Sequence, residues 1–314
     1  MIRMFLSENG SLNKIEQPQP GCWICLTNPT ESELALVSEK CSLDVDTLRA
    51  ALDEEERSRI EIGDNYNMIV VNIPMIEQRK KEELYTTIPL SIILTKEIII
   101  TVCLTDTPIL DAFMNGRVRD FYTHMKTRFV LQILYRNATL FLQYLHNIDK
   151  KSEIVERKLH GSTQNSELIE LLKLEKSLVY FTTALRSNEI VLEKLLRTDN
   201  IKKYPEDTDL LEDVIIENKQ AIEMANIYSG ILSGTMDAFA SVISNNLNIV
   251  MKFLAIITIV LSIPNIIFSA FGMNLDFSNI PLVNGAWGFF YVIVLTVVIC
   301  IASAVYFMKK RMFK

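Results

Sequence analysis

The sequence predicts an α+β domain with a small mixed sheet, followed by a long helix and two C-terminal transmembrane helices. Three observations lead to this prediction. Residues 1–248 are charged like a soluble protein, whereas the chain from 249 to Lys309 is almost uncharged. Runs rich in β-branched residues fall within roughly the first 120 residues. From Thr127 to about Leu196 the chain has almost no Gly or Pro, and apolar residues recur at helical spacing.

Residues 1–122 are interpreted as a cytosolic α/β domain. A strand is predicted over 22–27, and it ends at Asn28-Pro29-Thr30, a turn that also signals a helix start. The remaining predicted elements are helices at 31–40 and 45–51 and strands at 66–74, 88–94 and 97–102.

Residues 123–204 are interpreted as a cytosolic helical hairpin, with a break at 161–163 between its two helices. Pro205 then begins a stalk helix, residues 205–249, that continues into the membrane without an internal break. About 60 residues at 1.5 Å each give a rod of roughly 90 Å.

Residues 250–314 are interpreted as a transmembrane pore module. Its two spans, about 250–271 and 287–307, are each long enough to cross a bilayer. The link between them has no Lys or Arg, whereas basic residues follow the second span, so both termini are expected in the cytosol. The N-terminus carries no apolar signal segment. These features predict a multi-pass protein of the plasma membrane.

The first span carries a polar face, a set of small or polar residues at alternating three- and four-residue spacing. Its members are Asn248, Met251, Ala255, Thr258, Ser262, Asn265, Ser269 and Gly272, of which Met251 is the exception in chemical type. This spacing puts all of them on one side of a helix. Because buried polar groups are costly in lipid, this side must meet protein or water.

Two interpretations of the polar face are open. It is a small-residue seam for tight helix packing, or several copies of it surround an axis and line a pore. The amides of Asn248 and Asn265 are more polar than tight packing requires. Pro264 disturbs the backbone of the helix, which is tolerated where freed carbonyls face a cavity. The pattern therefore favours the pore. Two spans cannot enclose a pore, which therefore requires a homo-oligomer.

The polar face carries no Asp, Glu, Lys or Arg beyond Lys252. Neutral amides and hydroxyls suit a hydrated cation better than a dehydrated one. Mg²⁺ gives up its water reluctantly, so this chemistry favours Mg²⁺ without excluding Co²⁺, Ni²⁺ or Zn²⁺.

Other classes of function find little support. The net charge of −6 and the absence of a basic stripe argue against nucleic acid as a partner. No phosphate-binding loop or His-centred constellation indicates an enzyme or a bound cofactor. The pair Cys22 and Cys25 has the spacing of a zinc motif but lacks a second pair of ligands, so a buried strand with free thiols is the favoured interpretation.

Phe271-Gly272-Met273-Asn274, directly after the first span, resembles the aromatic-Gly-Met-Asn signature of CorA-type Mg²⁺ transporters. The short loop, second span and basic tail that follow match the same family. The resemblance extends to Asp237, Ser241, Ser244-Asn245, Val250-Met251-Lys252, Trp23-Ile24, Asn28-Pro29-Thr30 and Arg59-Ile60-Glu61, and so covers essentially the whole chain.

The resemblance implies a homopentameric funnel with a central pore, open to divalent cations and gated by cytosolic Mg²⁺. It implies that Gly272, Met273 and Asn274 form a ring at the outer mouth that binds the hydrated ion. The resemblance gives Asn248, Met251, Leu254, Ser262 and Asn265 as pore-lining residues, and the spacing of the polar face adds Thr258 and Ser269. Among them, Met251 and Leu254 would form a hydrophobic constriction that closes by dewetting.

The family also implies an acid on the stalk helix that senses cytosolic Mg²⁺ between subunits, and Asp213 has that position. The alternative is that Asp213 and its acidic neighbours complement the N-terminal end of a helix dipole. Glu82 and Glu83 are candidates for the facing acid.

The loop after Asn274 departs from the family pattern, because Asp276 is its only acid. This departure leaves open a Zn²⁺ transporter of the ZntB type. A third hypothesis is a non-conducting membrane-anchored scaffold, which predicts no flux and tolerance of charges along the polar face.

Overall fold

The computed structural model describes residues 1–8, 11–79, 82–159, 166–198, 205–273 and 287–309. Two compact units, Met1–Thr235 and Met236–Lys314, divide the chain. The first unit contains β1 (Ile2–Glu8), β2 (Ser11–Ile15), β3 (Trp23–Thr27), α1 (Glu31–Cys41), α2 (Val45–Arg49), the short 3₁₀ helix η1 (Ala50–Leu52), β4 (Arg59–Ile62), β5 (Tyr66–Arg79), β6 (Glu82–Thr95), β7 (Ile99–Cys103), α3 (Pro108–Met114), α4 (Lys126–Leu159) and α5 (Ser166–Arg197). Helix α6 (Pro205–Phe271) begins in the first unit and ends in the second, which also contains α7 (Gly288–Lys309).

The strands form one seven-stranded sheet in the order β2-β1-β3-β7-β6-β5-β4. Strands β3 and β7 are parallel, and the other neighbours are antiparallel. The predicted mixed sheet is therefore confirmed, as are the long helix and the apolar C-terminal helix. Strands β1, β2 and β4 and helix α3 are additions that the sequence pattern did not indicate.

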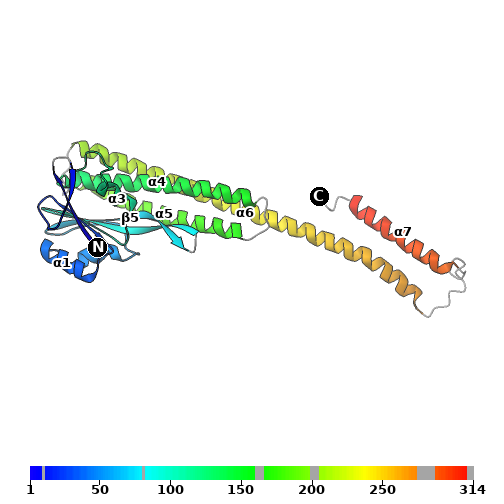
Figure 1. Cartoon of the computed structure of the whole chain (residues 1–314). Coiled ribbons are helices and arrows are strands. Elements are labelled where there is room, and N and C mark those ends of the chain that lie inside the picture. Colours follow the sequence, from blue (N-terminus) through cyan, green and yellow to red (C-terminus); the bar gives the residue numbers. More distant parts are fainter. Residues whose placement is uncertain (9–10, 80–81, 160–165, 199–204, 274–286, 310–314) are drawn as a thin grey trace. The chain divides into compact units, whose positions relative to one another are not determined.

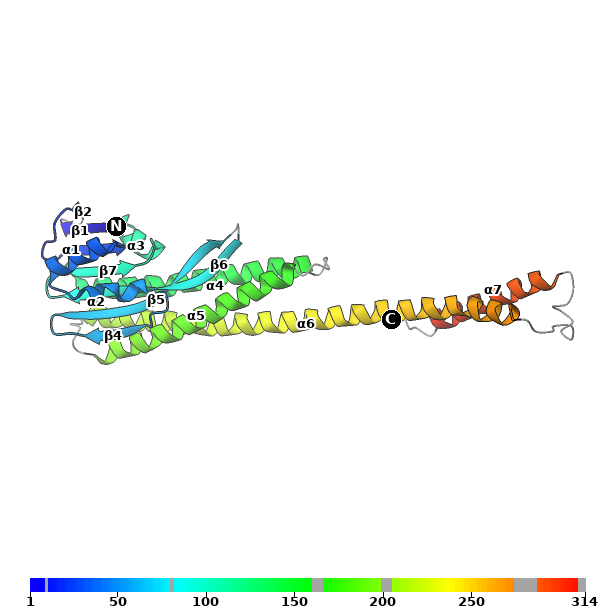
Figure 2. The ribbon, with the colours of Figure 1, turned by 90° about the horizontal axis from the view of Figure 1, so that it is seen from below.

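Helices cover both faces of the sheet, α1 on one side and α4 and α5 on the other (Figures 1 and 2). Strand β3 is buried on both faces, and its side chains alternate between them. Ile24 belongs to the core under α1, whereas the ring of Trp23 meets that of Phe129 on α4 at 5.0 Å between centroids. Two-sided burial explains why the first four residues of this strand are all apolar rather than alternating with polar ones.

Cys22 and Cys25 are both free and buried. Cys22 belongs to the same core as Ile24, and burial raises the pKa of both thiols. No group of three or more metal-ligating side chains is found within the described part of the chain. Cys25 lies in β3 and Cys22 directly precedes it, so the structure bears out the expectation of buried free thiols at this strand.

Three asparagines link α4 and α5 to the sheet by hydrogen bonds. They meet at the part of β5 that extends beyond its pairing with β4. Asn72 on β5 donates its backbone N–H to Oδ1 of Asn188 at 2.9 Å. The Asn72 carbonyl accepts from Nδ2 of Asn188 at 2.7 Å and from Nδ2 of Asn137 at 2.9 Å. Both helix asparagines are about 97% buried (3% and 2% exposed), because they satisfy backbone groups that no strand reaches.

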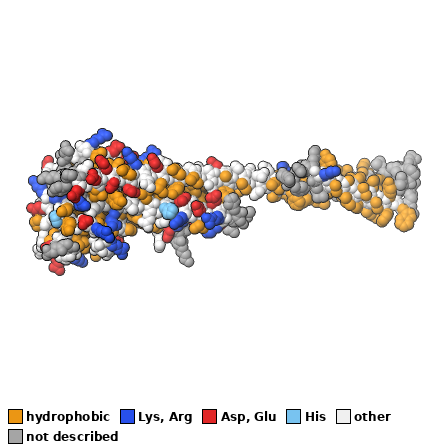
Figure 3. Space-filling model, turned by 90° about the horizontal axis from the view of Figure 1, so that it is seen from above, with side chains coloured by type: hydrophobic (Ala, Val, Ile, Leu, Met, Phe, Trp, Pro, Cys, Tyr) orange, Lys and Arg blue, Asp and Glu red, His pale blue; other side chains and the backbone are white. Residues whose placement is uncertain are grey.

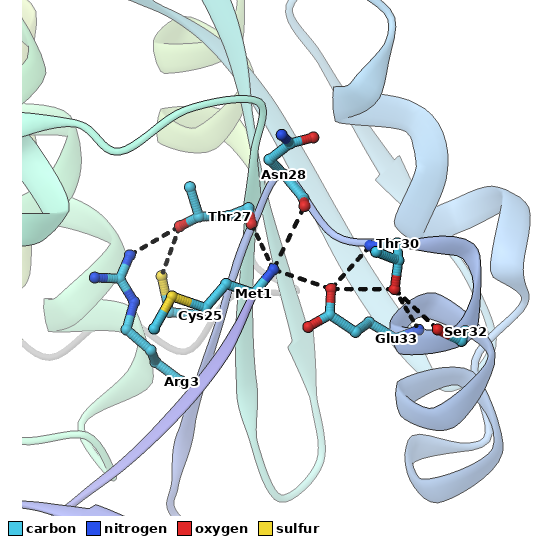
Figure 4. A network of polar contacts seen from close by, with 8 residues as sticks. All are labelled: Met1, Arg3, Cys25, Thr27, Asn28, Thr30, Ser32 and Glu33. Atoms are coloured by element: carbon cyan, nitrogen blue, oxygen red, sulfur yellow. Dashed lines mark hydrogen bonds and ion pairs between the residues drawn. The ribbon is translucent and has the colours of Figure 1, made fainter.

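Helix α1 begins with a capping box, as the Asn28-Pro29-Thr30 turn predicts (Figure 4). Thr30 Oγ1 accepts from the Glu33 N–H at 3.3 Å, and Glu33 Oε2 accepts from the Thr30 N–H at 2.8 Å. The same carboxylate lies 2.9 Å from the Met1 ammonium, which also donates to the Thr27 carbonyl at 2.8 Å. These contacts join α1 to the first strand and to the end of β3.

Glu33→Gln is expected to destabilise the chain slightly at neutral pH. The Thr30 N–H and then the Met1 ammonium lower the pKa of Glu33. A lowered folded-state pKa contributes stability above the unfolded value of about 4.3, and this contribution disappears as the pH falls through the folded pKa. The carboxylate is partly solvated, so the expected loss is about 0.5 kcal/mol.

Thermal unfolding followed by circular dichroism at pH 7 and pH 3 measures this effect. The exposed Glu39, farther along α1, supplies the control Glu39→Gln, which should unfold like the unsubstituted chain at both pH values. A Glu33→Gln deficit that persists at pH 3 would show that packing rather than the charge is responsible.

Candidate functional site on helix α6

The polar face lies in the second unit and is open in the single chain. Six of its eight members are exposed along α6, Gly272 is exposed directly after the end of the helix, and Ser262 is half-buried. Met251 is 58% exposed, and the neighbouring Leu254 is 52% exposed. The spacing in the sequence therefore does place these residues on one accessible side of a continuous helix.

Helix α7 contacts the opposite side of α6. Ile256 is 8% exposed, and Val292 and Thr296 on α7 are 7% and 3% exposed. The Cys300 thiol of α7 donates a hydrogen bond to the Val260 carbonyl of α6 at 3.8 Å. At about 100° per residue, the polar face points roughly 150° away from the side that carries Ile256, Val260 and Ile263.

This arrangement excludes one form of the packing interpretation. A small-residue seam between the two apolar helices of one chain would contact α7, but the polar face does not. The residues of α7 that contact α6 were not singled out in the sequence, since the uniformly apolar composition of α7 gives no sign of which side faces its neighbour.

Two hydroxyls of the polar face are bonded along their own helix. Thr258 Oγ1 donates to the Leu254 carbonyl at 2.8 Å, and Ser262 Oγ donates to the Thr258 carbonyl at 2.7 Å. Each hydroxyl thus uses its only proton on the backbone. Its lone pairs stay available on the exposed side, where they can accept hydrogen bonds from water but cannot donate.

The C-terminal end of α6 is tightly turned. The Gly272 N–H donates to the Phe268 carbonyl at 2.8 Å. A Cβ added at Gly272 would lie 3.2 Å from that carbonyl oxygen, so a side chain here would require the last turn to shift by a few tenths of an ångström. Met273 is 58% exposed, whereas Asn274 and Asp276 lie outside the described residues.

Asp213 is exposed on the part of α6 within the first unit. Two acidic neighbours of Asp213 form ion pairs: Arg128 on α4 pairs with Glu206 at 3.3 Å and lies 4.0 Å from Asp207. Within the described residues no ion pair of Asp213 is found. Glu83, one candidate for the facing acid, pairs with Lys151 of its own chain. The side chain of Glu82 lies outside the described residues.

The second unit is strongly apolar. Figure 3 shows acidic and basic side chains over the first unit and mainly hydrophobic ones along the second. Two helices, Glu206–Phe271 and Gly288–Phe307, contain stretches long and apolar enough to cross a membrane. Most of their large apolar side chains are exposed in the single chain; examples are Leu261 at 63% and Phe289 at 82%.

The chain is similar to known proteins along nearly its whole length. It is 29% identical to the cobalt/magnesium transport protein CorA of Methanocaldococcus jannaschii over 286 residues, 88% of this chain and 86% of that protein. The complete structure of the CorA magnesium transporter from the same organism superposes with a TM-score of 0.85 at 24% identity, covering 99% of this chain and 98% of that one.

The ZntB cytoplasmic domain from Vibrio parahaemolyticus superposes with a TM-score of 0.58 at 12% identity, covering 77% of this chain and 98% of that domain, and shares the fold alone. The model of the CorA-like Mg²⁺ transporter protein family matches residues 19–311. The chain therefore belongs to the CorA-like Mg²⁺ transporter family.

Proposed function

We propose that this chain is the subunit of a homopentameric channel in the plasma membrane that admits divalent cations, Mg²⁺ above all, into the cytosol. The observation that carries the proposal is the exposed polar face of α6, which points away from α7. The names of the curated relatives, which refer to magnesium or cobalt/magnesium transport, support the choice of ion.

The energetic argument concerns what covers the polar face in a bilayer. Asn265 and Ser269 are exposed within an apolar helix, and exposing an unsatisfied amide to hydrocarbon costs several kcal/mol. Helix α7 does not cover them. Copies of α6 around a shared aqueous axis would supply water and neighbouring polar groups instead, and so remove this cost.

The chemistry of this face suits an ion that keeps its water. Thr258 and Ser262 present acceptors because their protons are engaged by the backbone. Water molecules bound to a cation point their hydrogens outward and need such acceptors. A strongly hydrated ion such as Mg²⁺ fits this lining. The hydrophobic side chains of Met251 and Leu254 would close the pore by excluding water.

Flux measurements in proteoliposomes test the proposal. Mg²⁺ entry is expected with the unsubstituted chain and should be reduced by Co²⁺ or Ni²⁺ as competing ions. Zn²⁺ flux that exceeds Mg²⁺ flux would favour a ZntB-type transporter, for which the divergent loop with Asp276 as its only acid is the specific observation. Absence of flux for every ion would leave the scaffold hypothesis.

Gating is proposed to depend on cytosolic Mg²⁺ held between subunits by Asp213. Asp213→Ala is expected to raise the internal Mg²⁺ concentration that halves the current by about tenfold, the equivalent of roughly 1.4 kcal/mol of lost binding. The physical reason is that removing a carboxylate removes charge and ligand oxygens from the sensing site. Current recordings over a series of internal Mg²⁺ concentrations measure the shift.

Asp209→Ala is the matched control, because Asp209 is also exposed near the N-terminus of α6. On the alternative interpretation, both acids would act only by complementing the positive end of the helix dipole. Equal effects of the two substitutions would assign the acids to the dipole and remove Asp213 as the sensor.

A further inference from the structure

Pro264 interrupts the backbone hydrogen bonds of α6 at a defined point. Helix α6 continues through this proline from Pro205 to Phe271. Proline has no N–H, and in a helix the N–H of residue 264 would donate to the carbonyl of residue 260. The Val260 carbonyl therefore lacks its regular helical partner, in a segment where hydrocarbon offers no substitute.

The Cys300 thiol of α7 supplies a donor to this carbonyl. Cys300 Sγ lies 3.8 Å from the Val260 carbonyl oxygen, and the two residues are 40 positions apart in the chain. Cys300 is half-buried, as are Val260 and Pro264. The hydroxyls of Thr296 and Ser303 on α7, by contrast, donate to carbonyls of their own helix. The thiol thus contacts α6 where its hydrogen-bond ladder is broken.

This contact lies at the level of the polar face. Ser262 lies two residues before Pro264, and Asn265 directly follows it. The proposed function assigns both Ser262 and Asn265 to the pore. A missing backbone bond makes a helix easier to bend, so the orientation of these two side chains depends on what holds the backbone here.

We propose that Cys300 is a positioning residue: its thiol replaces the backbone donor lost at Pro264, ties α6 to α7, and so holds Ser262 and Asn265 toward the pore. This inference rests on the proposed function for its consequence in transport. The hydrogen bond itself is independent of transport. A thiol is a weak donor, so it steadies the helix while still allowing it to bend.

A cycle of substitutions tests the inference. Cys300→Ala removes the donor and is expected to lower Mg²⁺ flux in proteoliposomes by about two- to tenfold, as the loss of one hydrogen bond implies. In the Pro264→Ala background the N–H of residue 264 returns, and Cys300→Ala should then change flux by less than twofold.

Thr296→Val on α7 is the matched control, since its hydroxyl bonds within its own helix. It should leave the flux unchanged. Equal losses from Cys300→Ala in both backgrounds would show that the thiol acts through packing and would overturn the inference.

Infrared spectroscopy of the S–H stretch separates this inference from the proposed function. The Cys300 band, obtained as the difference between the unsubstituted chain and Cys300→Ala, should lie at the lower wavenumber of a hydrogen-bonded thiol. It should move toward the free value in Pro264→Ala, where the N–H competes for the carbonyl. A band at the free-thiol position in the unsubstituted chain would overturn the hydrogen bond from Cys300 to Val260, and with it the inference, even if Mg²⁺ flux is found. A band at the bonded position with no flux of any ion would support this hydrogen bond and reject the proposed channel.

Discussion

Thr258→Phe is expected to reduce Mg²⁺ flux below about a tenth of that of the unsubstituted chain, because a bulky apolar ring on the polar face would narrow and dewet a pore lined by α6. Thr258 is exposed and points away from α7, and its hydroxyl already uses its proton on the Leu254 carbonyl. The substitution therefore leaves the contact between α6 and α7 intact. It removes one acceptor and adds apolar bulk on the proposed lining.

The neighbouring Ile257 supplies the control for this prediction. Ile257→Phe adds the same ring about 100° around the helix, at almost the same depth, and is expected to keep most of the flux. Both variants are measured in proteoliposomes after chromatography confirms equal assembly. Comparable flux from Thr258→Phe and the unsubstituted chain would remove the polar face from the ion pathway and favour a scaffold.

Asn274→Ala is expected to reduce Mg²⁺ uptake by about tenfold or more at low external Mg²⁺. An uncharged amide ring at the outer mouth would hold the hydrated ion by hydrogen bonds to its water, and each such bond contributes about 1 kcal/mol, several times over in a ring of identical subunits. Uptake against external Mg²⁺ concentration measures the effect, and the half-saturating concentration should rise.

Asn279→Ala is a suitable control, because this asparagine belongs to the same link between the two apolar helices but not to the Gly-Met-Asn motif. It should alter uptake little. If Asn274→Ala transports Mg²⁺ with an unchanged half-saturating concentration, the mouth is not the site of ion capture. The polar face would then have to select the ion by itself.

Much of the first unit could be predicted because its signals are local. The strand that begins at Trp23 opens with four apolar residues. The cap at Thr30 is encoded within four residues, where a threonine and a glutamate three positions apart satisfy each other's backbone. Strand β4 was not predicted because it is short, and its charged residues Arg59 and Glu61 resemble a loop. It exists because Arg59 to Ile62 pair with the edge of β5, which is a contact between separate segments.

The buried asparagines of α4 and α5 likewise could not be predicted from local sequence. Asn137 and Asn188 lie in the middle of α4 and α5, where their residue type indicates neither burial nor function. Their role follows from the place where β5 extends beyond β4, so that the backbone groups of Asn72 have no strand partner on that side. No pattern within either helix contains that information.

The sequence by itself determined the two apolar helices, the unbroken length of α6 and the membership of the polar face, because hydrophobicity and helical period are properties of consecutive residues. Only the tertiary structure decided that α7 contacts the side of α6 opposite this face, and that Cys300 meets the carbonyl freed by Pro264. The physical reason is that a helical pattern fixes which residues share a side, whereas the neighbour of each side is chosen by packing between segments distant in the chain. Helix α7 is apolar all round, so its own pattern could not name the side that meets α6.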